Sequence, residues 1–178
     1  TGTVAPVFAD RLVEVTYSKL GAQHLLKAWI PLLALAASRP GAWSAVCIGR
    51  PKRGGPPVER TLGPPEALAV DLLGDLVSIY DAGRREPIPL PLKTSYAWAE
   101  CRHTRGLPEK QAGYKWNSGR FPGENEEPAH VHVWGRSKLD VLLKPVRPGE
   151  EYDGETTRLG AYAARLWLPM LQAEGAEA

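Results

Sequence analysis

The best candidate for metal-dependent chemistry is the run of residues 12–17, which alternates between its two faces as a strand does. Hydrolysing a phosphodiester through two divalent cations requires clustered carboxylates, usually with a lysine that steadies the nucleophile or the phosphate. The run supplies only Glu14, and the residue two positions later is Thr16. Lys19 falls at the start of the next predicted helix and is expected to point elsewhere. We therefore predict no catalytic and no metal-binding residue here, with Glu14 as a solvent-facing strand residue.

The other reactive side chains do not form a recognisable site. His130 and His132 are the one close histidine pair, and no cysteine or obvious third ligand accompanies them, so zinc is not predicted. The glycine-containing run 49–55 lacks the spacing and the final serine or threonine of a phosphate-binding loop. Cys47 and Cys101 lack metal-type spacing, and we expect two reduced thiols. No cofactor is predicted.

Basic residues gather around residues 51–57, a stretch rich in proline and glycine that we expect to form a hairpin tip. The four positive charges around it are Arg50, Lys52, Arg53 and Arg60. Prolines would stiffen this loop, and glycines would let another backbone approach closely. Such a loop can contact phosphates without reading bases, so it is our first candidate for DNA binding. The alternative is a solvated hairpin tip.

A second candidate for DNA binding combines the basic Lys115 and Arg120 with the aromatic Trp116 and Phe121. Aromatic rings interleaved with basic residues can stack on the bases of a single strand. Two observations count against this interpretation. Tryptophans usually pack in cores, and the three glutamates within residues 124–127 would repel a phosphate backbone. These glutamates fit a protein partner or plain solvation better.

Composition bounds the fold and the location. A chain of 178 residues with 43% hydrophobic side chains can form one domain with a real core, so we expect a single domain over residues 1–178. Its net charge of +2 does not by itself demand a nucleic-acid partner. We find no uncharged apolar run long enough for a bilayer and no secretion signal, and we expect a cytoplasmic protein without a membrane partner. The missing initiator methionine suggests a fragment of a longer protein.

The candidate strand leads into a long apolar helix at about residues 19–37, which Pro31 should kink or divide. On the strand, Val13, Val15 and Tyr17 share one face, which we expect to help bury the core. Residues 43–50 and 58–62 form two further predicted strands of a hairpin.

The rest of the chain is mainly helical. Helices are predicted at about 66–82 with Gly83 as C-cap, from Thr94 or Ser95 to 103, at 108–117, and at 158–172 after a capping threonine at 156 or 157. Residues 86–92, 118–128 and 144–156 are expected to be extended or looped, and residues 1–10 and 173–178 to be flexible. Residues 129–134 alternate like a strand but follow a proline typical of a helix start, so the pattern leaves both open. This order indicates an α/β or α+β protein with a small sheet.

Several stretches together resemble the C-terminal region of the RecC family, the gamma chain of exodeoxyribonuclease V, the RecBCD helicase–nuclease. They are LLKAWIPLLALAAS, WSAVCIGR, LLGDLVSIYDAGRREPIPLPLKTSYAWAE, KWNSGRFPGENEEP and the closing LWLPML. The resemblance begins near Tyr17 and runs almost to the end. No single motif is catalytic, but their order is specific.

The resemblance implies a restriction-endonuclease-like (PD-(D/E)xK) core with a small mixed sheet, a degenerate active site and extra C-terminal helices. RecB-type nucleases carry Asp-Tyr-Lys on a strand, and here Tyr17 keeps the middle position. Thr16 and Ser18 stand where the aspartate and lysine would be. Gln23 is followed four residues later by Lys27, where such nucleases have tyrosine. The resemblance also favours a helix at residues 129–134.

The function implied is that of a non-catalytic module of RecBCD in double-strand-break repair by homologous recombination. It would serve as a scaffold for RecB and RecD and would split or guide DNA strands, without being an enzyme by itself. Two alternatives stay open. The first is an active metal-dependent nuclease whose missing carboxylates lie upstream of residue 1. The second is a pure protein-interaction domain that never touches DNA.

Overall fold

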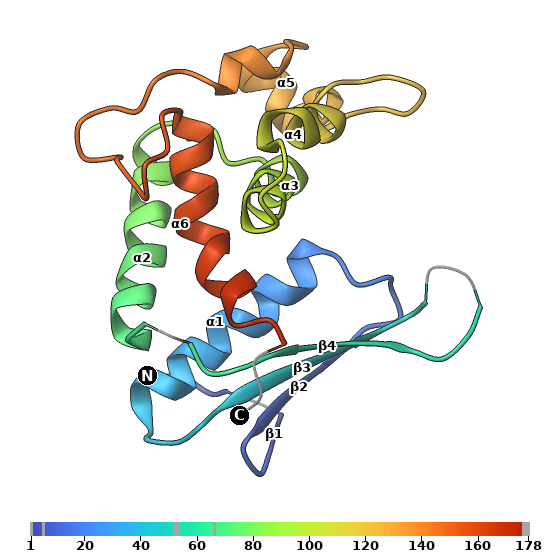
Figure 1. Cartoon of the computed structure of the whole chain (residues 1–178), viewed down its shortest axis with the longest axis vertical. Coiled ribbons are helices and arrows are strands. Elements are labelled where there is room, and N and C mark those ends of the chain that lie inside the picture. Colours follow the sequence, from blue (N-terminus) through green and yellow to red (C-terminus); the bar gives the residue numbers. More distant parts are fainter. Residues whose placement is uncertain (1, 5, 52–53, 66, 176–178) are drawn as a thin grey trace. The chain divides into compact units, whose positions relative to one another are not determined.

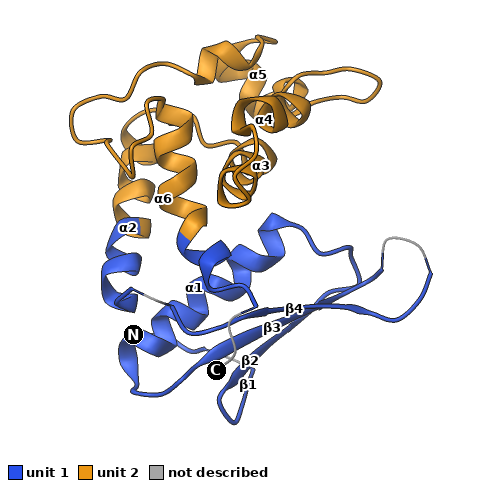
Figure 2. Ribbon diagram, in the orientation of Figure 1, with its two compact units in different colours: residues 1–75, 169–178 blue, residues 76–168 orange. Residues whose placement is uncertain are grey.

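The computed structural model describes residues 2–4, 6–51, 54–65 and 67–175, which form an α/β protein with a small mixed sheet (Figure 1). The elements in chain order are β1 (Val7–Phe8), β2 (Arg11–Val15), α1 (Ala22–Ser38), β3 (Ser44–Gly49), β4 (Val58–Leu62), α2 (Ala69–Arg85), α3 (Leu92–His103), α4 (Pro108–Trp116), the 3-10 turn η1 (Glu124–Glu126), α5 (Pro128–Trp134), the 3-10 turn η2 (Leu139–Leu142) and α6 (Arg158–Gln172). They form two compact units (Figure 2). Unit 1 comprises Thr1–Asp75 and Pro169–Ala178, and unit 2 comprises Leu76–Leu168.

The sheet of unit 1 has the strand order β1-β2-β3-β4. The central strands β2 and β3 are parallel and are joined by α1, which packs against both, whereas the two outer pairings are antiparallel. The antiparallel pairing of β3 with β4 confirms the predicted hairpin, and Val58–Leu62 matches its predicted bounds. In this register Glu14, Cys47 and Arg60 are neighbours across three strands.

Unit 1 corrects two predictions for the first strands. Val7 and Phe8 form β1 within the stretch expected to be a loop, because a two-residue strand is too short to show a periodic pattern. The face of β2 that we expected to help bury the core is the wrong one: Val15 and Tyr17 are 68% and 91% exposed, whereas Leu12 is 5% exposed. Alternation reveals that a strand has two faces, but not which of them a helix will cover.

Helix α1 begins at Ala22, three residues later than predicted, with Gly21 as its N-cap. The backbone N–H of Gly21 donates to Nδ1 of His24, 3.1 Å away, which satisfies a donor at the helix start. Pro31 lies inside this one continuous helix rather than dividing it. The predicted apolar face is buried, with Leu25 and Trp29 at 0% and 1% exposure.

Unit 2 is built around α3 and α4, which pack against each other. Trp167 of α6 is fully buried there, and its indole N–H donates to Oγ of Ser95, 2.9 Å away. The ring of Tyr96 meets Trp167 edge-on, with 5.3 Å between centroids. Aromatic packing of this kind adds to the stabilisation from buried area.

The helices of unit 2 confirm some predicted boundaries and correct others. Gly83 lies inside α2, which continues to Arg85 and stops before a proline, so it is not the C-cap. Helix α3 starts at Leu92, with Pro91 rather than Thr94 or Ser95 as N-cap, because a carboxylate elsewhere in the chain caps it. Residues Pro128–Trp134 form a helix, as the family resemblance favoured. Helix α6 has its predicted bounds.

Candidate functional site

The two positions expected to be degenerate, Thr16 and Ser18, follow directly after β2 and are held by local and backbone hydrogen bonds. The backbone N–H of Thr16 donates to the carbonyl oxygen of Ile48 at 2.9 Å, and that of Arg50 donates to the carbonyl of Ser18 at 2.9 Å. Pairing with β3 therefore continues beyond the end of β2. The Thr16 hydroxyl accepts from the backbone N–H of Ser18 at 3.2 Å. Neither side chain offers the negative charge that binds a divalent cation or the positive charge that steadies a phosphate.

The remaining carboxylate of the strand is neutralised. Oε1 of Glu14 lies 2.5 Å from Nζ of Lys27 on α1. The Glu14 side chain is 22% exposed and that of Lys27 is 68% exposed, so Glu14 is half-buried and paired with an exposed lysine rather than facing solvent as we expected. Lys27 stands where the resemblance leads us to expect a tyrosine, and this contact gives the lysine a physical role. The lysine on the helix pairs with a carboxylate that would otherwise attract a metal ion.

Beside Glu14 on the neighbouring strand lies the thiol of Cys47, and beside Cys47 lies Arg60, which belongs to a second ion pair. Burial raises the pKa of the Cys47 thiol to about 11, and the charge of Glu14 adds to the shift, so the thiol is protonated and unreactive near neutral pH. Arg60 is half-buried and pairs through two guanidinium nitrogens with the carboxylate of Glu174. Across the described ranges, no three histidine, cysteine, aspartate or glutamate side chains gather closely enough to hold a metal ion.

The first basic surface is the tip of the β3–β4 hairpin. Lys52 and Arg53 lie outside the described residues. Arg50 is exposed at the end of β3 and makes no ion pair within the described part of the chain. Arg60 is already paired with Glu174, so its charge is not free for a phosphate. Among the described residues, Arg50 is therefore the candidate of this surface that remains exposed and without an ion pair.

The second basic surface loses its tryptophan. Trp116 is fully buried, its indole N–H donates to the carbonyl of Ser137 at 3.0 Å, and its ring meets that of Trp134 edge-on at 5.9 Å. Its ring has no face free for a base, so Trp116 leaves the predicted DNA surface. Lys115 and Arg120 remain exposed.

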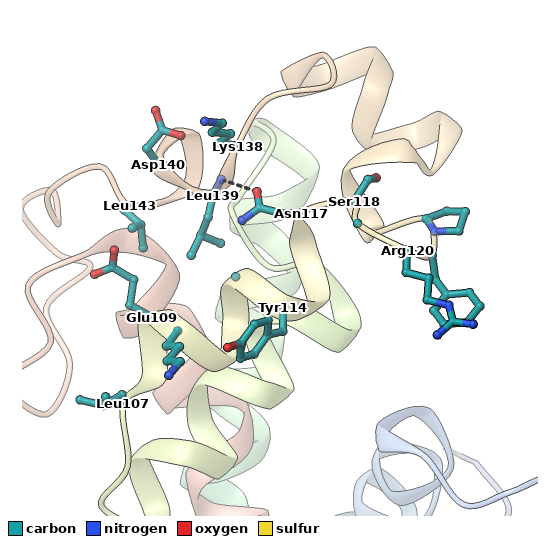
Figure 3. A pocket seen from close by; sticks show the side chains of 15 residues that line it. Leu107, Glu109, Tyr114, Asn117, Ser118, Arg120, Lys138, Leu139, Asp140 and Leu143 are labelled. Carbon is teal, nitrogen blue, oxygen red and sulfur yellow. Dashed lines mark hydrogen bonds between the residues drawn. The ribbon is translucent and has the colours of Figure 1, made fainter.

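An unforeseen groove lies beside Arg120, with a cavity of about 950 Å³ between α4, the 117–122 loop and η2 (Figure 3). Its exposed aromatic residues are Tyr114 and Phe121, and its cations are Lys110, Arg120 and Lys138. The sequence analysis named Arg120 and Phe121 but missed Tyr114 and Lys138, because Lys138 comes from a separate segment of the chain. The backbone N–H of Leu139 donates to Oδ1 of Asn117 at 3.2 Å, which ties η2 to the end of α4.

The glutamates of residues 124–127 are not the uniform acidic patch that the sequence indicated. Glu124 is 2% exposed, and its carboxylate accepts from the backbone N–H groups of Lys93 and Thr94, at 2.8 and 2.7 Å, and from the Thr94 hydroxyl at 2.6 Å. It caps the start of α3 from 30 residues away. Glu127 pairs with Nζ of Lys93 at 2.8 Å, and this hydrogen bond raises the pKa of that lysine. Glu126 stays exposed and, among the described residues, makes no ion pair.

A buried arginine pins the loop before α6. Arg158 is 6% exposed and binds Glu150 at 2.6 Å and Glu86 at 2.8 Å. Burial pushes the pKa of Glu150 up, but hydrogen bonds from the Arg158 guanidinium and the Arg147 backbone outweigh it and lower that pKa. A hydrogen bond from Arg147 is the largest cause of the lowered pKa of Glu86. This network is structural, because all its charges are paired with each other.

Comparison with known proteins identifies the family. A model of the RecC C-terminal domain matches residues 1–103. The RecBCD enzyme subunit RecC of Mycolicibacterium smegmatis is 66% identical over 176 residues, which cover 98% of this chain and 16% of the relative. The chain belongs to the RecC family. The RecC subunit of Mycobacterium tuberculosis (strain H37Rv) is 55% identical over 179 residues, again covering 98% of this chain and 16% of the relative.

The chain therefore spans about a sixth of the length of these RecC relatives. Along the part of the chain that the structure describes, no helix combines the length and the apolar character needed to cross a bilayer.

Proposed function

We propose that this chain is a non-catalytic, nuclease-like module of a RecBCD assembly that takes part in double-strand-break repair by homologous recombination. It acts as a scaffold for RecB and RecD and guides or splits DNA strands by contact. The module has no turnover of its own, although the assembly it serves is the exodeoxyribonuclease V helicase–nuclease. The location that goes with this role is the cytoplasm, next to the DNA.

The observation that carries the proposal is a strand–helix frame whose reactive positions hold uncharged or paired side chains. Strand β2 feeds α1 and returns to the parallel β3, and the antiparallel β1 precedes it, an order that suits a degenerate restriction-endonuclease-like core. Thr16 and Ser18 occupy the positions where a RecB-type nuclease would have aspartate and lysine. Glu14 is held by Lys27. A frame kept without its charges supports a role in architecture and contact.

The scaffold role is supported by apolar side chains exposed on and just before α2. Val70, Val77 and Tyr80 lie at helical spacing and are 61%, 58% and 65% exposed, and Leu68 before them is 70% exposed. Single exposed apolar residues are common, but a row along one helix is typical of a surface that meets another protein. We assign this row, Leu68, Val70, Val77 and Tyr80, to a contact with RecB or RecD.

The guiding role is supported by the hairpin tip, where Arg50 is exposed and unpaired among the described residues. Cations on a stiff loop position a duplex through its phosphates and carry no sequence information. Each phosphate contact that is lost should lower the slope of log K against log salt by about 1.

The test is forked-DNA binding by the full-length subunit assembled with RecB and RecD. Charge reversal by Arg50→Glu with Lys52→Glu should weaken binding and flatten its salt dependence. The matched control, Arg105→Glu with Lys144→Glu, changes the charge equally at two other exposed cations and should have no effect. Unchanged binding in the hairpin variant would contradict the guiding role and favour a pure protein-interaction domain.

A further inference from the structure

The groove of unit 2 is lined by two exposed aromatic side chains. Tyr114 and Phe121 line it with 67% and 73% of their surfaces exposed, and the guanidinium carbon of Arg120 lies 5.8 Å from the centroid of the Phe121 ring. Exposed aromatic rings in a concave site are typical of binding surfaces, because water solvates them poorly. An arginine over such a ring adds a cation that can stack beside it.

The loop that carries Arg120 and Phe121 is tied at its base by side-chain hydrogen bonds. The Ser118 hydroxyl donates to Oδ1 of Asn125 at 2.9 Å and accepts from the backbone N–H of Gly123 at 3.1 Å. Gly123 is packed so closely that a Cβ atom there would lie 2.1 Å from the carbonyl oxygen of Trp116. The loop is therefore closed at its base. A preorganised loop loses little entropy when it binds a ligand.

The charge of the groove separates into two ends (Figure 3). Arg120 lies at one end, away from both carboxylates, whereas Glu109 and Asp140 lie towards the other, where Lys138 stands beside Asp140. Within the described residues, none of the three groove cations makes an ion pair. The nearby carboxylates of Glu124 and Glu127 are bound by groups of α3, Glu124 by backbone N–H groups and Glu127 by the Lys93 side chain. They therefore repel an anion less than the sequence indicated. The Arg120 end therefore suits a ligand that joins flat rings to negative charge.

We propose that this groove binds a short segment of single-stranded DNA. Bases stack on Tyr114 and Phe121, and Arg120 contacts an adjacent phosphate. This inference rests on the proposed contact with DNA and specifies which surface takes a strand after separation. Stacking on aromatic rings accepts any base, so the groove binds without sequence preference. Losing one stacked base weakens binding by about tenfold.

The experiment is photo-crosslinking of oligothymidylate that carries 5-iododeoxyuridine to the full-length subunit assembled with its partners, followed by mapping of the linked peptides. We expect crosslinks at Tyr114 and Phe121. Tyr114→Ala with Phe121→Ala should reduce linkage to residues 107–122 at least tenfold, and Phe121→Trp should retain it. Phe8 is also exposed, at 62%, and Phe8→Ala is the matched control that should leave linkage unchanged.

The outcomes separate this inference from the proposed function. Crosslinks at the hairpin around residues 50–60 with none at 107–122 overturn the groove and leave the guiding role standing. An absence of crosslinks anywhere in the chain overturns the groove, and the guiding role is then decided by the forked-DNA binding of the hairpin variant. If the partner subunits protect residues 107–122 in the assembly and DNA does not link there, the groove is a protein interface and the inference fails.

Discussion

The buried carboxylate of Glu124 should decide whether the first turn of α3 stays closed. The perturbation is Glu124→Ala, which removes the acceptor for two backbone N–H groups and the Thr94 hydroxyl at once. Glu124→Gln keeps the shape of the side chain but replaces one acceptor oxygen with a donor. The control is Glu126→Ala, two residues away and exposed.

The magnitude follows from what is left unbonded. A hydrogen bond to a charged group contributes about 1.5–3 kcal/mol, and loss of a helix cap costs about 0.5–2 kcal/mol; these contributions are not additive. Thr94 is fully buried, so water does not replace the lost acceptor easily. We expect the free energy required to open the first turn of α3 to fall by about 2–3 kcal/mol in Glu124→Ala, and by somewhat less in Glu124→Gln.

The assay is hydrogen–deuterium exchange of the amides of α3 in the full-length subunit. A loss of about 2–3 kcal/mol corresponds to roughly 30- to 150-fold faster exchange at Lys93 and Thr94, since each 1.4 kcal/mol is a factor of ten. Exchange in Glu126→Ala should match that of the unmodified protein. If Glu124→Ala exchanges no faster than Glu126→Ala, the carboxylate does not cap the helix and the reasoning is refuted.

Three further predictions concern buried charge and the buried thiol. Replacing Arg158 by methionine should lower the free energy of unfolding by about 3 kcal/mol in urea denaturation, because it leaves the carboxylate of Glu150 without its partner; a loss below 1 kcal/mol would contradict this. The lowered pKa of Glu150 contributes stability that is present above its ordinary pKa of 4.5 and is lost as pH falls through the lower folded value, so Glu150→Gln should flatten the decline of Tm below that pH, and an unchanged profile would argue against it. Cys47 should resist a thiol reagent at pH 8 until the protein unfolds, whereas the half-exposed Cys101 should react first.

Local chemistry explains which elements the sequence could predict. Helix α6 has the predicted bounds because its start is written nearby: the Thr157 hydroxyl accepts from the backbone N–H of Gly160 at 3.1 Å. The β3–β4 hairpin was predictable because a loop rich in proline and glycine separates two short runs that each read as a strand. Residues 129–134 required the family resemblance, since their alternation favours a strand whereas the preceding Pro128 favours a helix start.

Contacts between distant residues explain what the sequence could not show. Arg60 looked like a free cation, but its partner Glu174 lies 114 residues later. Glu124 looked like surface charge, but it caps a helix 30 residues earlier. Trp116 looked available for stacking until the burial of its ring was known. In each case the sequence showed the residue type but not its partner, because residues that meet only in the folded structure leave no local pattern in the sequence.

The central claim is that this strand–helix frame has kept its architecture and lost its chemistry. Its most direct test is digestion of linear DNA by the full-length subunit, purified without RecB and RecD, in Mg²⁺ or Mn²⁺. We predict no cleavage above a buffer control, with the same result for Glu14→Ala. Reproducible metal-dependent cleavage that disappears in Glu14→Ala would contradict the claim, because it would make Glu14 a metal ligand and the module an active nuclease.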